Sequence, residues 1–225
     1  MELATVALAR FIGFFEIADL DPRGRLHYPD LFAGLVQRFG FQKFPQKYEE
    51  FYPQKGIELA AGKWESGSID KVVIYSGGIV VDTRSSTDDS EKVLDECLMW
   101  TRTEFGLQYH QEMIKRKGYV SQLTFYSDAP IFSALSSPLS RLAQNVTRSL
   151  EKSLGEKINY EPSSFAIHLD QTTRQLSPAA FTLQRRAGIP FTDNKYFSEA
   201  PLPTGIHKEL LKAFEADLRA APKLI

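Results

Sequence analysis

The stretch from residue 70 to residue 107 constrains the fold more than any other part of the sequence. Two runs rich in β-branched residues, 72–75 and 79–81, flank the pair Gly77-Gly78, and glycine readily adopts the positive φ angles of a tight hairpin turn. Asp88 then provides a helix N-cap. We therefore expect a β-hairpin followed by a helix. The apolar stripe of this helix consists of Val93, Leu94, Cys97, Leu98, Thr101 and Phe105.

The order of elements around this stretch recurs later in the chain. Residues 1–110 predict a strand, a helix, a strand, a hairpin and a helix, and residues 118–222 predict the same series. The first helix of the second half has an apolar stripe of Leu139, Leu142, Val146, Leu150 and Leu154. The series predicts an α+β protein of two similar halves packed as one globular unit, with a mostly antiparallel sheet and helices on one face.

Duplication is one interpretation of this order, and two unrelated α+β halves are the other. Matched residues such as Ile57 and Ile167, or Gly78 and Gly188, fall at corresponding places in the two halves. The order of elements resembles the saddle fold of TATA-binding protein, in which a β-α-β-meander-α unit is duplicated. The resemblance implies a saddle-like topology and nothing about DNA. With 27 basic and 28 acidic residues, the chain lacks the excess positive charge that nucleic-acid binding requires.

Cysteine content and the N-terminal segment indicate where the protein works. The only cysteine, Cys97, lies in an apolar helix stripe, so no internal disulfide can form and we expect a buried thiol. The N-terminal segment carries Glu2 where a signal peptide would be positive, and Arg10 interrupts its apolar run. No apolar run approaches the length of a membrane-spanning helix. These features predict a cytoplasmic protein.

Strand alternation predicts that one sheet face of the first half is both apolar and turned away from the helices. It carries Ile12, Phe14, Val72 and Ile74, which is too much apolar surface to leave in water. The loop at 41–56 adds further aromatic side chains, namely Phe44, Tyr48, Phe51 and Tyr52. We expect a protein contact here, either with a second copy of the chain or with a separate partner. Coverage of the face by the loop itself is the alternative.

The corresponding face of the second half is polar. We expect His168 and Asp170 of one strand to lie near Gln184 and Arg186 of another. A solvated sheet face is one interpretation, and a small-ligand site at these four residues is the other. His168 and Asp170 would supply two metal ligands, or a base and the group that orients it, but no third group stands at motif spacing. The sequence therefore predicts no metal, no cofactor and no catalytic residue.

Two other patterns have simple explanations. Asp19, Asp21 and Gly24 follow the spacing of a calcium loop, but Arg23 stands where a ligand belongs, so we expect a turn. The basic cluster Lys-Arg-Lys at 115–117 is either a solvated connection or a contact with an anionic partner or lipid headgroup.

We therefore expect a non-catalytic interaction, adaptor or sensor subunit that uses the apolar face and the aromatic loop of the first half. The first alternative is a small-ligand-binding protein or enzyme with a polar site in the second half. The second alternative is a protein that binds membrane surfaces or lipid through the apolar patch and the basic cluster at 115–117.

Overall fold

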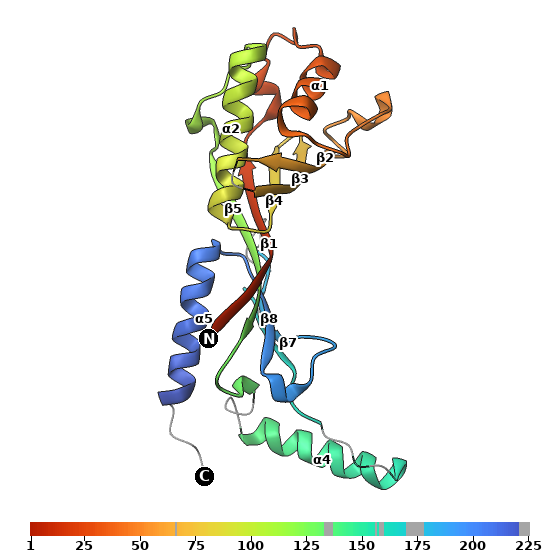
Figure 1. Cartoon of the computed structure of the whole chain (residues 1–225), viewed down its shortest axis with the longest axis vertical. Coiled ribbons are helices and arrows are strands. Elements are labelled where there is room, and N and C mark those ends of the chain that lie inside the picture. Colours follow the sequence, from red (N-terminus) through yellow and green to blue (C-terminus); the bar gives the residue numbers. More distant parts are fainter. Residues whose placement is uncertain (66, 133–136, 156, 158–159, 170–177, 221–225) are drawn as a thin grey trace. The chain divides into compact units, whose positions relative to one another are not determined.

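The computed structural model describes residues 1–65, 67–132, 137–155, 157, 160–169 and 178–220. These residues form four α-helices and eight β-strands (Figure 1). In chain order the elements are β1 (Glu2–Phe14), α1 (Tyr28–Phe39), β2 (Ile57–Trp64), β3 (Gly67–Tyr75), β4 (Gly78–Thr83), α2 (Thr87–Phe105), β5 (Arg116–Tyr126), α4 (Ser137–Leu154), β6 (Ser164–Ile167), β7 (Phe181–Arg185), β8 (Lys195–Ala200) and α5 (Thr204–Ala220). The predicted α+β class is confirmed, and so is the order of elements in each half.

The chain divides into two compact units. The first unit comprises residues 6–121 and 201–205, and the second comprises residues 1–5, 122–200 and 206–225. Strands follow the order β2-β3-β4-β1-β5 in the first unit and β5-β8-β7-β6 in the second. Pairing is antiparallel in both, as β3 with β4 and β7 with β8 show. Each half of the sequence therefore arranges its four strands in the same way.

The hairpin and helix predicted at 70–107 are confirmed. Gly78 has a φ of 151°, and a Cβ added there would lie 2.3 Å from a backbone oxygen of β1, so the turn needs glycine. α2 begins after Ser86, whose hydroxyl accepts a hydrogen bond from the N–H of Asp89. The prediction of Asp88 as N-cap is wrong, because Asp88 already lies in the first turn.

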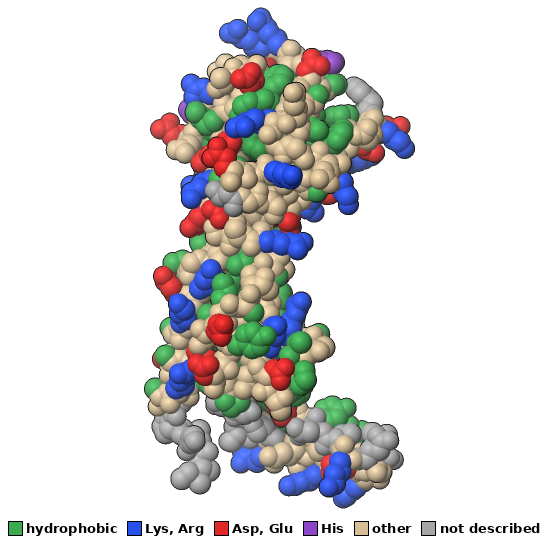
Figure 2. Space-filling model, viewed as in Figure 1, with side chains coloured by type: hydrophobic (Ala, Val, Ile, Leu, Met, Phe, Trp, Pro, Cys, Tyr) green, Lys and Arg blue, Asp and Glu red, His purple; other side chains and the backbone are tan. Residues whose placement is uncertain are grey.

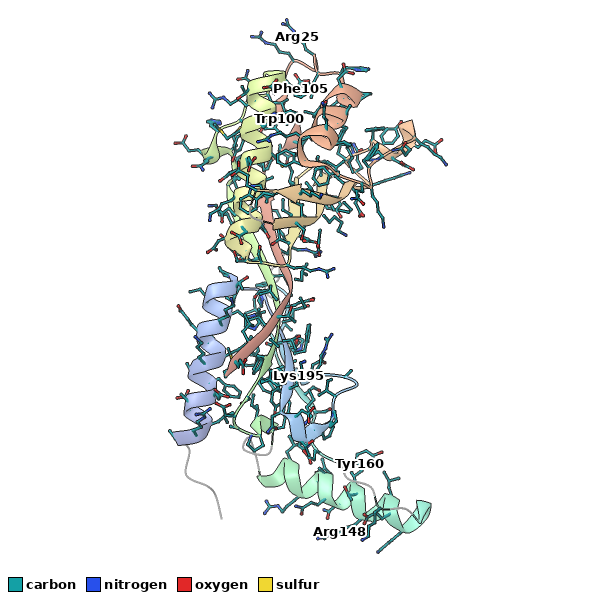
Figure 3. The ribbon with its side chains drawn as sticks, in the orientation of Figure 1. Arg25, Trp100, Phe105, Arg148, Tyr160 and Lys195 are labelled. Atoms are coloured by element: carbon teal, nitrogen blue, oxygen red, sulfur yellow. The ribbon has the colours of Figure 1, made fainter. Side chains whose placement is uncertain are left out.

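The core of the first unit lies between its sheet and the helices α1 and α2. α1 ends at Gly40, in the left-handed conformation. The ring centroid of Trp100 of α2 lies 6.3 Å from that of Phe39 and 5.6 Å from that of Phe105. Figure 3 labels Trp100 and Phe105. The whole apolar stripe of α1 is used in this core. Its buried residues are Leu31, Phe32, Leu35 and Phe39.

Aromatic rings dominate the core of the second unit. Tyr196 of β8 is fully buried, and its ring centroid lies 5.7 Å from those of Phe125 and Phe132. α5 adds Leu211, which is also buried. The apolar stripe of α4 is different: Leu139 is 41% exposed and Leu142 is 59% exposed.

The first residues of α2 and α5 form two reciprocal hydrogen bonds. The N–H of Thr87 donates to the Oγ1 of Thr204 over 3.1 Å, and the N–H of Thr204 donates to the Oγ1 of Thr87 over 2.9 Å. Both residues are buried. Because the first N–H groups of a helix lack partners within it, each threonine supplies the acceptor that the other helix needs.

Candidate functional site

The register of β3 against β4 decides which side chains face outward in the first unit. Phe11 and Val72 both pair with Val81, and all three are buried in the core. Ile74 lies on the same side and packs against this core. The prediction that Val72 and Ile74 face away from the helices is therefore wrong. The predicted face of β3 was shifted by one residue, which moves every side chain of a strand to the opposite side.

Ile12 and Phe14 lie on the sheet face opposite this core. Ile12 pairs with Val80, and Val80 pairs with Val73, so these residues form one apolar strip across three strands. The guanidinium of Arg116 lies 4.3 Å from the centroid of the Phe14 ring, and both Ile12 and Phe14 are half-buried. A cation of the first unit thus already covers part of the strip.

Charged pairs border the strip. The Nε of Arg10 donates to Asp82 over 2.7 Å and an NH2 group of the same guanidinium donates over 2.8 Å. Asp82 is buried, so this two-bond contact balances a carboxylate that would otherwise be costly to bury. Lys71 and Glu58 form a second pair at 3.6 Å.

The loop at 41–56 runs beside β2 and is held at several points. Lys43 forms a bridge with Ala60 of β2, and Phe51 packs on Phe32 with ring centroids 5.2 Å apart. Phe41 is buried. Of the remaining predicted interface residues, Phe44 is 38% exposed and Tyr52 is 45% exposed, whereas the side chain of Tyr48 lies outside the described part of the chain. Figure 1 shows the loop, in orange, standing out beside β2.

Tyr75 at the end of β3 was missed by the sequence-based prediction. Its side chain is 43% exposed, and its ring lies so close to Gly56 that an added Cβ would be 2.6 Å from it. Strand alternation with Val73 was the signal that could have found it. An open hollow of about 490 Å³ adjoins Gly56. It is lined by Lys43, Phe44, Pro45, Glu49, Glu50, Lys55, Gly56 and Glu58.

The structure describes three of the four polar residues that were predicted as a site in the second half. Gln184 and Arg186 are exposed on β7 and on the turn after it, and Arg186 stacks on Phe197 at 5.6 Å. His168 is exposed beyond the end of β6, and Asp170 lies outside the described residues. Five cavities of the described chain are lined by residues of the first unit. The ligand site at these residues stays a prediction.

Arg185, which lies between Gln184 and Arg186 in the sequence, is buried. Its guanidinium donates to Glu161 over 2.7 Å and to the carbonyl oxygen of Phe191 over 3.1 Å. The rings of Phe191 and Tyr196 lie 4.2 Å and 5.8 Å from it. This arginine therefore ties the segment before β6 to the loop between β7 and β8, which is a structural role.

Two buried titratable groups belong to the second unit. His207 of α5 is hydrogen-bonded to the hydroxyl of Ser198 at 2.9 Å, and burial lowers its pKa to about 4. Burial alone would raise the pKa of Glu215, but hydrogen bonds from the Met1 amino group and from Ser127 hold that pKa below its usual range. Both groups support packing within the unit.

The other chemical patterns have structural explanations. The carboxylate of Asp21 accepts hydrogen bonds from the backbone N–H groups of Arg25 and Leu26, so it closes a turn. Cys97 is buried, and burial raises the pKa of its thiol. In the basic cluster, Lys117 pairs with Glu91. Over the described residues, no three His, Cys, Asp or Glu side chains gather as metal ligands.

No known family model matches the chain, and no curated protein matches it either. Over the described residues, no helix is both long and apolar enough to cross a membrane. The assignment of function therefore rests on the surface of the chain itself.

Proposed function

We propose that the protein is a non-catalytic interaction subunit that binds a protein partner through the first unit. The observation that carries this proposal is the exposure of three aromatic residues of the first unit, Phe44, Tyr52 and Tyr75, which are 38%, 45% and 43% exposed and which we call the aromatic surface. Tyrosine and other aromatic residues are enriched among the side chains that contribute most to protein binding, because they bury large areas at small entropic cost.

The charges beside the aromatic surface suit a protein partner. Two lysine and three glutamate residues line the hollow at Gly56, so positive charge does not dominate as it would at a nucleic-acid site. A ring of charged groups around aromatic contacts is the usual layout of a protein interface, with an apolar centre and a polar rim. The strip at Ile12 and Phe14 is a second apolar area of the same unit.

A matched pair of variants tests the proposal. The triple variant Phe44→Ser, Tyr52→Ser, Tyr75→Ser removes the aromatic surface. The control, Met99→Ser, Tyr160→Ser, Ile206→Ser, removes side chains that are 48%, 49% and 46% exposed elsewhere. Both variants would be compared with the unaltered chain in affinity purification from the native host followed by mass spectrometry. A partner that is retained by the control and lost by the triple variant supports the proposal. Identical partner sets for all three proteins would contradict it.

A second copy of the chain is the simplest partner, and light scattering after size exclusion tests it. If the aromatic surface joins two copies, the unaltered chain has the mass of a dimer and the triple variant has the mass of a monomer. If both are monomers, the partner is a different protein. We also propose a reducing cytoplasm as the compartment, on the support of one buried thiol and no second cysteine.

A membrane surface is a second candidate partner, and the exposed stripe of α4 favours it. Leu139 and Leu142 are exposed, as are Arg141, Arg148 and Lys152 on the same helix. Figure 2 shows Lys and Arg side chains along α4. An apolar stripe flanked by basic residues is typical of helices that lie in an anionic membrane interface.

Sedimentation with vesicles tests this candidate. We expect binding to phosphatidylserine-containing vesicles, weaker binding to phosphatidylcholine alone, and loss of binding in Leu142→Glu. The control is Leu210→Glu on α5, a leucine that is 48% exposed. If neither change affects sedimentation, α4 does not bind lipid.

A further inference from the structure

A cavity of about 60 Å³ lies inside the first unit. Helices α1 and α2 form one side of it, and strands β2 and β3 form the other. Its walls include Leu31, Leu35, Leu94, Leu98, Ile57 and Ile74. Protein interiors are normally packed so closely that few voids exceed the size of a water molecule, so a space of this size at the centre of a core is unusual.

The lining of the cavity is almost wholly apolar. Two of the polar residues at its wall already have partners: the Asp21 carboxylate accepts two backbone N–H groups, and the hydroxyl of Thr101 donates to the Leu98 carbonyl oxygen over 2.9 Å. A buried water needs two to four polar partners, and apolar cavities stay dry. Water is therefore a poor occupant of this space.

Some of the lining residues are accessible to solvent. Tyr28 is 44% exposed, and Asp21, Leu26 and Pro53 are half-buried. An apolar group that enters there would meet only apolar side chains further in. Any polar atom attached to that group would stay beside Tyr28 and Asp21 at the outer end.

We propose that this cavity is a binding site for a small uncharged aliphatic group, with a branched alkyl end as its best occupant. The volume sets the size: apolar cavities of about 150 Å³ take benzene or xenon, so a space of about 60 Å³ takes a xenon atom or a few carbon atoms. Charged and strongly polar ligands are excluded, because the wall offers nothing to replace their water.

Methyl NMR of the full chain tests the site with xenon and with isobutanol as probes. We expect saturable shifts of the methyl groups of Leu31, Leu35 and Leu94. The methyl groups of Leu123 and Leu183, buried in the second unit, should not move. Shifts that are equally large in both units, or that never saturate, would overturn the proposal.

Variants that fill the cavity provide the second test. Val72→Ile adds one methylene group at the cavity wall, and Val93→Ile adds the same group at a buried position of α2 that does not line it. The affinity for isobutanol should fall by about tenfold in Val72→Ile, because the space of one methylene group in an apolar pocket changes binding by about that factor. The affinity should stay unchanged in Val93→Ile. Cys97→Leu, which also fills the wall, should give the same loss if Val72→Ile does not fold. Equal affinity in the filled and control variants would overturn the site.

Discussion

α1 and α4 occupy the same place in the order of the two halves, yet the leucines of their apolar stripes are buried to different extents. Leu31 and Leu35 of α1 are 7% and 5% exposed, whereas Leu139 and Leu142 of α4 are 41% and 59% exposed. Both helices have an apolar stripe, and both follow the first strand of their half. The difference therefore arises outside the helices.

Strand length explains the difference. β2 and β3 contain 8 and 9 residues, whereas β6 and β7 contain 4 and 5. A shorter sheet offers less apolar area for a helix to cover, and the stability of a helix comes mainly from such packing. An amphipathic stripe thus indicates that a helix can be buried, and the neighbouring strands determine whether it is.

The largest expected effect separates these two helices. Leu35→Ala should lower the free energy of unfolding by about 3 kcal/mol, because it removes buried apolar contacts and enlarges the cavity that Leu35 lines. Leu142→Ala should change it by less than about 0.5 kcal/mol. Urea unfolding followed by circular dichroism measures both, and tryptophan fluorescence follows the first unit, which contains Trp64 and Trp100. A similar cost for the two changes would show that α4 is packed after all.

The next effect concerns the second unit alone. Arg185→Leu should lower its free energy of unfolding by about 2 kcal/mol, because it removes charge-assisted hydrogen bonds from a buried site. The matched control is Arg186→Leu at the adjacent exposed position, with little expected change. Circular dichroism in urea measures the loss. If tryptophan fluorescence shifts by the same amount, the two units unfold together and the comparison between them must be made kinetically.

The third effect is a dependence of stability on pH. Because the pKa of His207 is lowered from 6.5 to about 4 in the folded chain, the unfolded chain binds more protons between these values. Stability contributed by this group is complete above pH 6.5 and falls by about 1.4 kcal/mol per pH unit as the pH drops toward 4. Unfolding measured at pH 7, 6 and 5 should show this slope. The variant His207→Gln should have a smaller slope of stability against pH. The variant His110→Gln, at an exposed residue, should have the same slope as the unaltered chain. An unchanged slope in His207→Gln would assign it to other groups.

The smallest effect tests the contact that α2 and α5 share. Thr87→Val and Thr204→Val should each cost about 1 kcal/mol, since each leaves one helix N–H without an acceptor. Thr103→Val, at an exposed threonine of α2, is the control. Thermal unfolding suffices as the measurement. Unequal costs at the two threonines would show that one helix depends on the contact more than the other.

Local patterns predicted most of the fold. The hairpin at Gly77-Gly78, the stripe of α2 and the order of elements in both halves follow from turn chemistry and from periodicity, which depend on neighbouring residues. The outward face of β3 could not be predicted in this way. It depends on how β3 pairs with a neighbouring strand, and the observed register places Val72 and Ile74 on the core side of the sheet.

Only the part of the candidate site that local patterns indicate was predicted from the sequence. Phe44 and Tyr52 stood out in the sequence as aromatic residues of a loop rich in charges, and the structure shows them exposed. Tyr75 looked like an ordinary strand residue. Only the fold brings its ring against Gly56. The cavity of the first unit had no sequence signal, because every residue of its apolar wall is also a normal core residue.

The mutual contact of Thr87 and Thr204 also has a consequence for the order of events during synthesis. The two residues are separated by 117 positions, and a chain grows from its N-terminus at about 5 to 20 residues per second. For about 6 to 23 s after Thr87 is made, Thr204 is not yet present to accept the hydrogen bond from the N–H of Thr87 at the start of α2. The first unit therefore reaches its final form only after Thr204 has been translated, although most of its residues come early.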